Sequence, residues 1–290
     1  DALFARFAAS YAELRALPRS ARRALQRQLA RSSELAAVLP EYLQHGGRRL
    51  QHRMAWSLAG AALLLALGQG MATAATITVT TNDPRIVADG QCSLVEAIVN
   101  ANDDAATHAD CPAGSGADTI ALPANANVML SATYCIMYGH VCSSVGAGLP
   151  SITSRITIEG NGTTIARQAN APAFGVMVVR YPGNLTLQHV TLSGGSSRRG
   201  VQNSGTLTVE NSTISGNTTG GVSNYFGTLA IKNSTISGNT ANFGAGVYNY
   251  GGAVTIENST ISGNRANVGG GGIYNGFSQG GGRLTITNST

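Results

Sequence analysis

Charged and aromatic residues are scarce in this sequence: 11% of its 290 residues are charged and 6% are aromatic. The composition is too apolar for simple disorder, and its 37 Gly residues are too many for an ordinary helical domain. Charge is also unevenly placed. Residues 1–53 hold ten Arg against four acids, whereas residues 54–290 hold nine basic residues against ten acids. A nucleic-acid-binding face needs clustered positive charge, so we do not expect residues 54–290 to bind nucleic acid.

Motifs of several metal-binding and catalytic classes are missing. The four Cys and five His residues show no zinc-binding spacing, so neither a metal site nor a cofactor is expected. The sequence also lacks the Gly-x-Ser-x-Gly of a nucleophile elbow and the Gly-Gly-x-Gly-x-Asp calcium repeat. Asp103, Asp104 and Asp110 lie close together without the regular spacing of a calcium loop. We interpret these three residues as part of a solvated loop.

A basic stretch near residue 50 is followed by an apolar run at 55–67 and by small residues at 72–74. This is the layout of a secretory signal peptide, which we predict over residues 54–75. A membrane anchor is the alternative interpretation. However, the thirteen positions of the apolar run fall short of the roughly 20 residues that a spanning helix needs. We therefore expect an exported protein, located outside the cell or on the cell surface.

The four cysteines, at positions 92, 111, 135 and 142, gain significance from the predicted export. An exported chain can form disulfides, and four cysteines allow three connectivities. The pairs Cys92–Cys111 and Cys135–Cys142 close the smallest loops, so these are the favoured pairs.

A short αβ module is predicted at the start of the mature chain. The sequence Thr-Ile-Thr-Val-Thr-Thr at 76–81 alternates as a strand does. Ser93, followed three residues later by Glu96, forms a capping box that opens a helix. This role explains Glu96 better than catalysis does. The helix is expected to bury Leu94, Ala97, Ile98 and Ala101.

Apolar-alternating segments begin at residues 156, 185, 207, 229, 254 and 284, at intervals of 22 to 30 residues. Periods of this length indicate a solenoid, and units made of strands without helical stretches point to a parallel β-helix. Leu207 and Val209 are expected to point inward, and Thr208 and Glu210 outward. The fold class is therefore all-β, with a cap formed by the preceding strand and helix.

The heptad Asn-Ser-Thr-Ile-Ser-Gly-Asn recurs at 211–217, 233–239 and 258–264. Its first Asn falls where strand alternation breaks, and Asn tolerates the left-handed conformation that a corner needs. Stacked coils place equivalent residues over one another, so their side-chain amides are expected to bond along the stack. Two such ladders are predicted: Asn211, Asn233, Asn258 and Asn288, and Asn217, Asn239 and Asn264.

Aromatic residues recur in the aligned segments Gly-Val-Ser-Asn-Tyr-Phe, Gly-Val-Tyr-Asn-Tyr-Gly and Gly-Ile-Tyr-Asn-Gly-Phe. Val222, Val247 and Ile273 are expected to align as inward residues. Tyr248 and Tyr274 then share one outward position, and Tyr225 and Tyr250 share another. Such rings serve as packing ladders, or they bind a carbohydrate or protein, since Tyr offers apolar area with a polar tip. These four tyrosines are the candidate binding residues.

The segment Asp-Gly-Gln-Cys-Ser-Leu-Val-Glu-Ala at 89–97 resembles the Cys-Ser-Leu-Arg-Glu-Ala motif of many exported bacterial β-helix proteins, with Val95 in place of the usual Arg. Over residues 76–290 the repeats are similar to those of polymorphic outer-membrane and choice-of-anchor families. The resemblance implies a right-handed parallel β-helix on an exported bacterial protein, with an adhesin-like role. The expected partner is a glycan or a protein on a host or neighbouring cell surface.

Some β-helix proteins cleave polysaccharides with clusters of Asp, yet no Asp follows Asp118 in this chain. In successive units the outward position before the corner reads Glu210, Lys232, Glu257, where opposite charges on neighbouring strands are expected to pair. No catalytic residue is therefore predicted, and the first hypothesis is a non-enzymatic structural or binding protein. The alternative is a carbohydrate-active lyase or hydrolase whose acids lie beyond residue 290.

The domain prediction follows from these segments. Residues 1–53 are an Arg-rich helical pre-region or translation upstream of a start at Met54. Residues 76–150 form the cap and first coils, and residues 151–290 form the repeats. Because the chain begins at Asp1 and ends inside a repeat, we expect it to be a fragment.

Peptide mapping tests the disulfide prediction. Mass spectrometry of the non-reduced protein, expressed with export, is expected to join Cys92 to Cys111 and Cys135 to Cys142. Free thiols or a crossed connectivity would contradict the loop-size argument.

Overall fold

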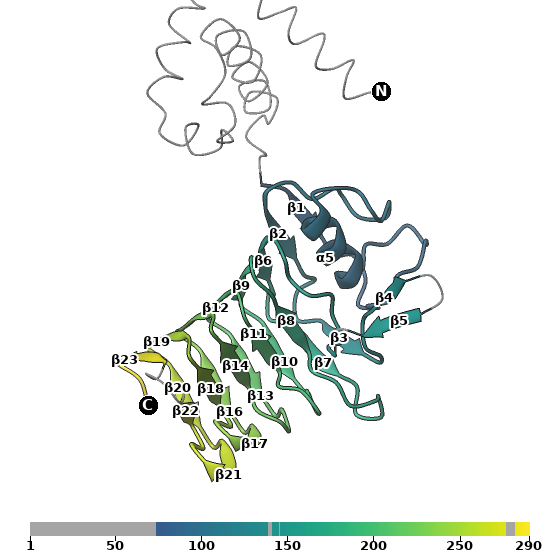
Figure 1. Cartoon of the computed structure of the whole chain (residues 1–290). Coiled ribbons are helices and arrows are strands. Elements are labelled where there is room, and N and C mark those ends of the chain that lie inside the picture. The colour runs from purple at the N-terminus through teal and green to yellow at the C-terminus, as the bar shows by residue number, and fades with distance from the viewer. Residues whose placement is uncertain (1–73, 139–140, 145, 277–281) are drawn as a thin grey trace, which may run out of the picture. The chain divides into compact units, whose positions relative to one another are not determined.

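The computed structural model describes residues 74–138, 141–144, 146–276 and 282–290 (Figure 1). The predicted pre-region 1–53 and nearly all of the predicted signal peptide lie outside these residues, as do the side chains of residues 136–145. Within the described part, no helix is long and apolar enough to cross a membrane.

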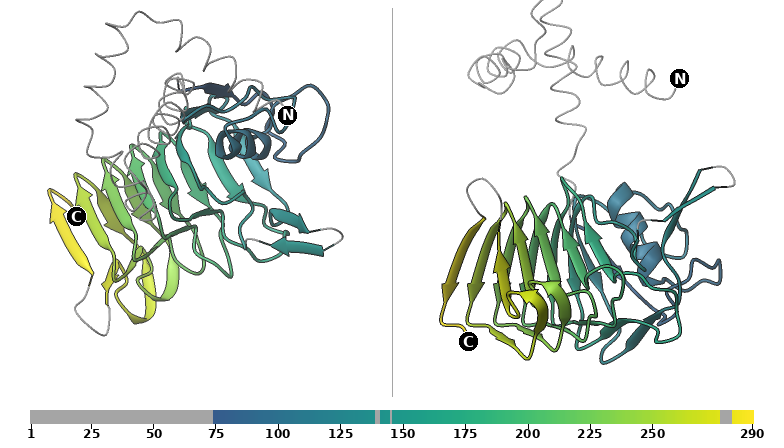
Figure 2. Two further views of the ribbon diagram at one scale, coloured as in Figure 1. Left: turned by 45° about the horizontal axis from the view of Figure 1, so that its top comes forward. Right: turned by 60° about the horizontal axis from the view of Figure 1, so that its bottom comes forward.

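Most described strands belong to three parallel sheets that run the length of the stack (Figures 1 and 2). The first sheet contains β1 (Thr76–Thr78), β2 (Ala117–Ala121), β6 (Arg155–Glu159), β9 (Asn184–Gln188), β12 (Thr206–Glu210), β15 (Thr228–Lys232), β19 (Ala253–Glu257) and β23 (Arg283–Thr287). The second contains β3 (Asn127–Leu130), β7 (Thr164–Arg167), β10 (Thr191–Ser193), β13 (Thr213–Ser215), β16 (Thr235–Ser237) and β20 (Thr260–Ser262). The third contains β8 (Met177–Val179), β11 (Val201–Asn203), β14 (Val222–Tyr225), β18 (Val247–Tyr250) and β22 (Ile273–Asn275).

Two smaller pairs project from this framework. The parallel pair β17 (Thr240–Phe243) and β21 (Arg265–Gly269), called the flap below, lies between the second and third sheets in sequence. The antiparallel pair β4 (Cys135–Tyr138) and β5 (Val141–Ser144) follows β3. Each coil thus visits the three sheets in turn, and each strand pairs with its equivalent in the next coil. The predicted parallel β-helix is confirmed.

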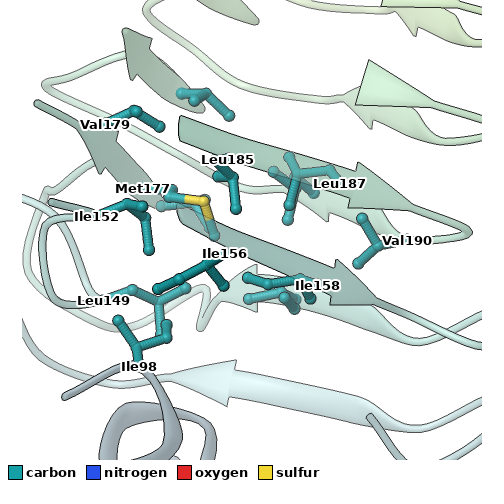
Figure 3. Close-up of a cluster of buried hydrophobic side chains, with 14 of the residues drawn as sticks. Ile98, Leu149, Ile152, Ile156, Ile158, Met177, Val179, Leu185, Leu187 and Val190 are labelled. Carbon is teal, nitrogen blue, oxygen red and sulfur yellow. The ribbon is translucent and has the colours of Figure 1, made fainter. Parts of the chain in front are cut away.

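The core is a column of aliphatic side chains inside the coils (Figure 3). Ile156 pairs in register with Leu185, and Leu185 pairs with Leu207; all three are at most 1% exposed. The same alignment holds for Val222 and Val247 in the third sheet, both fully buried. Each fully buried aliphatic side chain contributes roughly 1.5–3 kcal/mol, so the column supplies the main cohesion between coils.

The cap over the first coils is confirmed in detail. Helix α5 (Leu94–Asp103) packs against β1, β2 and β6, and its start carries the predicted capping box between Ser93 and Glu96. The four apolar helix residues expected inside are fully buried. Strand β1 is shorter than the predicted 76–81 because its continuation turns to bond the segment that leads into the helix, through Thr80 N–H and the Cys92 carbonyl, 2.9 Å apart.

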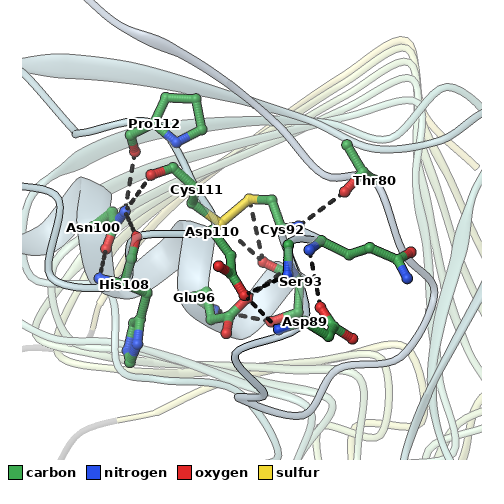
Figure 4. Close-up of a disulfide and its surroundings, with 12 residues drawn as sticks. Thr80, Asp89, Cys92, Ser93, Glu96, Asn100, His108, Asp110, Cys111 and Pro112 are labelled. Atoms are coloured by element: carbon green, nitrogen blue, oxygen red, sulfur yellow. Dashed lines mark hydrogen bonds between the residues drawn. A yellow bond between two sulfur atoms is a disulfide. The ribbon is translucent and has the colours of Figure 1, made fainter.

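A disulfide joins Cys92, which directly precedes the N-cap of this helix, to Cys111, as predicted (Figure 4). Cys135 is also disulfide-bonded, but its expected partner, Cys142, has its side chain outside the described residues. Asp110 accepts hydrogen bonds from the N–H groups of Asp89 and Gly90 at 2.9 and 3.1 Å, and so ties the loops of the cap together.

The first corner of each coil departs from the prediction in one respect. Asn211, Asn233, Asn258 and Asn288 all adopt the expected left-handed conformation, with φ of 47–50°. Their side chains are exposed, however, and no hydrogen bond joins these four described amides, so the predicted side-chain ladder is wrong here. The following serines make the ladder instead. The N–H of Ser212 donates to Ser234 Oγ, and that of Ser234 to Ser259 Oγ, both at 3.1 Å. The left-handed conformation turns the Asn side chain outward and the side chain of the following Ser inward. This explains why Ser, and not Asn, forms the ladder at this corner.

The second corner carries the ladder that the sequence predicts. Asn217 Nδ2 donates to Asn239 Oδ1, and Asn239 Nδ2 donates to Asn264 Oδ1, both at 2.9 Å. Asn217 and Asn239 are fully buried. Each amide oxygen also accepts a main-chain N–H of the preceding coil, as in the 3.0 Å bond from Asn217 N–H to Asn239 Oδ1. The side chains therefore satisfy backbone groups that the turn removes from the sheets.

A third ladder was not predicted. Asn203, Asn224, Asn249 and Asn275 each occupy the third position of a strand in the third sheet, and they bond one another at 2.7, 2.9 and 2.7 Å. The sequence does contain a pattern that could have predicted this ladder: Asn recurs at the third position of Val-Gln-Asn, Val-Ser-Asn, Val-Tyr-Asn and Ile-Tyr-Asn. Gly227 makes room for this ladder, because a Cβ there would lie 2.7 Å from Asn203 Nδ2 and 2.8 Å from Asn224 Oδ1.

The two corners generate a paired prediction on stability. Replacing Asn239 with Ala leaves the Asn217 N–H without its acceptor and removes one of the two acceptors of Asn217 Nδ2. A buried unsatisfied group costs about 1–3 kcal/mol. Asn233→Gly removes an exposed side chain at a left-handed position that Gly tolerates, so little change is expected. Urea unfolding of the full chain measures both. Equal losses in the two variants would contradict the assignment of buried and exposed roles.

Candidate functional site

The outward face of the third sheet brings together the candidate tyrosines. Tyr248 and Tyr274 are paired in register, with their rings nearly parallel (4°) and their centroids 5.4 Å apart. Tyr225 and Tyr250 also share a register position, as predicted, but their rings are tilted by 55° at 6.1 Å. The predicted alignment of both pairs is confirmed, whereas a parallel stack forms in the first pair only.

Two phenylalanines that the sequence analysis did not single out join this cluster. Phe226 meets Tyr250 edge-on at 5.5 Å, and Phe243 of the flap contacts Tyr274 at 5.2 Å. Parallel stacking turns the faces of Tyr248 and Tyr274 toward each other. The exposed aromatic area therefore comes mainly from three other rings: Tyr225, Phe226 and Phe243 are 37%, 65% and 38% exposed. We call these six residues the aromatic cluster: Tyr225, Phe226, Phe243, Tyr248, Tyr250 and Tyr274.

Arg199 links the aromatic cluster to the flap. Its guanidinium carbon lies 4.8 Å from the centroid of the Tyr248 ring, within the range of a cation–π interaction. One terminal nitrogen donates to the Phe243 carbonyl at 2.6 Å, and the other donates to the Gly244 carbonyl. The side chain passes over Gly220, where a Cβ would lie 2.2 Å from Nη1. Burial lowers the pKa of Arg199 below its usual value, but an Arg side chain stays protonated in proteins.

A cavity of about 380 Å³ opens between Arg199, the flap and the aromatic cluster. Three threonines and two asparagines contribute to its lining: Thr218, Thr219, Thr240, Asn242 and Asn267. Asn267 Nδ2 donates to Asn242 Oδ1 at 3.1 Å across the two flap strands. Thr219 Oγ1 is buried and has no hydrogen-bond partner among the described residues. We call this cavity the flap groove.

A second cavity, of about 450 Å³, lies at the first corner of the early coils. There His189 Nδ1 is 2.9 Å from Glu159 Oε1, and the same oxygen accepts the N–H of Asn161 at 3.1 Å. His189 takes the left-handed corner position that Asn occupies in the later coils, with φ of 50°. The sequence analysis named neither Glu159 nor His189, because they lie 30 residues apart and their contact depends on the stacking of two coils.

The prediction that Glu210, Lys232 and Glu257 form ion pairs is wrong. The three residues align in register, yet no ion pair joins them in the described part of the chain. Glu210 Oε2 instead accepts a hydrogen bond from Gln188 Nε2 at 3.1 Å. Lys232 is exposed, and an ion pair in water contributes too little to fix a long side chain. Within the described residues, no group of three His, Cys, Asp or Glu side chains could hold a metal ion.

The aromatic cluster generates a prediction on pH dependence. Burial, followed by the neighbouring Tyr225 and Tyr274, raises the pKa of Tyr248 above its usual value near 10. A raised folded-state pKa means that the folded form retains the proton. The stability contribution of the phenol is thus complete below pH about 10 and is lost as pH rises through the raised pKa. We expect Tyr248→Phe to gain stability relative to the unmodified chain above pH about 10.

Urea unfolding at several values between pH 8 and pH 11 measures this difference. If the two stability curves stay parallel over the whole range, Tyr248 does not titrate differently in the folded and unfolded states.

The comparisons with known proteins agree with this geometry. The sequence matches the family described as "Right handed beta helix region" over residues 114–290, which is more than half of the chain. Neither the search of curated proteins nor that of solved structures found a significant match. The matched segment covers the three parallel sheets from β2 onward, with their aligned core and corner ladders. The chain therefore belongs to the right-handed β-helix family.

Proposed function

We propose that this chain is an exported, non-enzymatic β-helix protein that binds a glycan through the aromatic cluster. Right-handed β-helices occur both among adhesins and among polysaccharide-degrading enzymes, so the proposal depends on the surface and not on the fold. The observation that carries it is the gathering of six aromatic rings on and beside the outward face of the third sheet, in a chain with few aromatic residues.

The physical argument rests on exposed and rigid aromatic area. Tyr225, Phe226 and Phe243 leave more than a third of their surface exposed, and each contacts another ring that limits its motion. Apolar sugar faces pack on such rings, while hydroxyls at the cavity edge bond the sugar oxygens. Because the stacked coils hold the rings in place, little conformational entropy is lost on binding. Cleavage, by contrast, needs an acid or base held against a bond, and neither Asp nor Glu is among the groove-lining residues.

A glycan array with the full chain tests this proposal. The double variant Tyr225→Ala/Phe243→Ala is expected to weaken binding about tenfold or more, since central aromatic residues carry most of a binding energy. Tyr181→Ala is the matched control, because Tyr181 is 85% exposed outside the cluster. Unchanged binding in the double variant, or equal loss in the control, would remove the aromatic cluster as the binding surface.

A second candidate function, a carbohydrate-active enzyme, is favoured by the Glu159–His189 contact in the corner cavity. A carboxylate that accepts from Nδ1 orients an imidazole so that Nε2 can act on a substrate proton. Product analysis on neutral and acidic polysaccharides tests this candidate. Chain shortening that is lost in Glu159→Gln would establish it and would overturn the non-enzymatic proposal.

A further inference from the structure

The acids of the later coils all lie on one sheet, away from the flap groove. Residues 119–290 contain eight basic residues and three acids, Glu159, Glu210 and Glu257. All three acids end strands of the first sheet, namely β6, β12 and β19. The flap groove lies beside the third sheet and is lined by Arg199 without any acid. The groove is therefore a positively charged site on a chain whose few later acids are on another sheet.

Arg199 has no carboxylate partner among the described residues, where the ion pairs join Arg85 to Asp83 and His189 to Glu159. A guanidinium has five N–H donors. Its two bonds to the Phe243 and Gly244 carbonyls leave donors for a further acceptor. A partly buried cation without a counter-ion favours an anionic ligand, because a charge-assisted bidentate contact would compensate its lost hydration.

The carbonyl bonds and the Tyr248 ring also fix where the charge lies. Three contacts hold the guanidinium before any ligand arrives, so little side-chain entropy remains to be lost. The polar part of the remaining lining consists of hydroxyls and amides, among them those of Thr218, Thr240 and Asn267. These groups suit the neutral hydroxyls of a sugar, and Phe243 offers an apolar surface at the flap edge. The volume of about 380 Å³ lies within the range of small-ligand sites.

We propose that the flap groove binds an acidic sugar unit of a polysaccharide, with its carboxylate on Arg199. This inference rests on the proposed glycan binding and names the class of glycan. Arg199 serves as the specificity-determining residue, since the other lining groups are neutral and do not distinguish an acidic sugar from its uncharged counterpart.

Three polymers with one backbone decide the question on the unmodified full chain. They are chondroitin, which carries carboxylates only, chondroitin sulfate, and carboxyl-reduced chondroitin, which is neutral. Binding is measured by calorimetry at low and at physiological ionic strength. We expect chondroitin to bind at least about tenfold more tightly than the carboxyl-reduced polymer, with affinity falling as salt rises. Equal affinity for the two would overturn the acidic-sugar inference and leave glycan binding intact.

Chondroitin sulfate separates carboxylate from sulfate recognition. Affinity for the sulfated polymer close to that for chondroitin supports the assignment of the carboxylate. Binding that appears only with the sulfated polymer overturns that assignment. Absence of binding to all three polymers overturns the inference as well. In that case the glycan array shows whether a neutral glycan still binds, so the two proposals fail separately.

Variants then assign the effect to one residue. Arg199→Gln is expected to remove the preference for chondroitin over the carboxyl-reduced polymer. Arg198→Gln is the matched control, because the adjacent exposed Arg198 bonds Gln202 and does not line the groove. Near-ultraviolet circular dichroism reports whether the flap stays folded in Arg199→Gln. If that variant unfolds, the comparison of polymers on the unmodified chain still decides the inference. An unchanged preference in a folded Arg199→Gln would overturn the role of Arg199.

Discussion

The register in which the coils stack depends on buried side-chain amides, such as those of Asn217 and Asn239 at the second corner. A β-helix must turn twice or more per coil, and each turn removes main-chain N–H and carbonyl groups from the sheets. Asn217 and Asn239 satisfy such groups from inside the coil and bond each other at the same time. An unsatisfied buried amide is costly, so each rung requires the next coil in register. The ladders thus specify the stacking that the apolar column alone would leave free to slip.

This requirement explains the composition. An amide inside a corner needs space that a Cβ on the neighbouring segment would occupy, as at Gly227 beside Asn203 and Asn224. Abundant Gly and Asn and scarce charge are consequences of the same geometry. The serine ladder of the first corner follows similar logic with a smaller side chain, since Ser234 Oγ accepts one N–H from the preceding coil and donates to its own strand at Lys232.

Exact stacking also shapes the surface. A residue type repeated at one outward position forms a line along the solenoid, and Tyr248 over Tyr274 is such a line. The flap groove forms where the regular repeat is interrupted. The flap is an insertion between the second and third sheets, and it encloses the flap groove against a line of rings. Arg199 reaches from one coil to the carbonyls of a coil two strand spacings away, so the groove depends on three coils together.

Much of the fold was predictable from local pattern. The 22–30-residue period, the inward Leu207 and Val209, the capping box at Ser93, the Cys92–Cys111 pair and the ladder through Asn217 all follow from spacing and side-chain chemistry. The shared positions of the four tyrosines followed as well. Each of these features either recurs at the same position in every coil or joins residues within about 20 positions of each other. In both cases the spacing along the sequence predicts which residues lie close in space.

The remaining features needed the tertiary structure. Whether Asn211 or Ser212 faces inward depends on the backbone rotation at the left-handed corner, which residue type alone does not specify. The Glu159–His189 contact and the Arg199 clamp join residues 30 and about 45 positions apart on different coils. Their contact is set by the lengths of the intervening turns and by the position of the flap. The sequence by itself thus determined the repeating unit, because stacking imposes the same residue at the same place. The tertiary structure decided where the repeat is interrupted and which side chains meet there, because those contacts cross between coils.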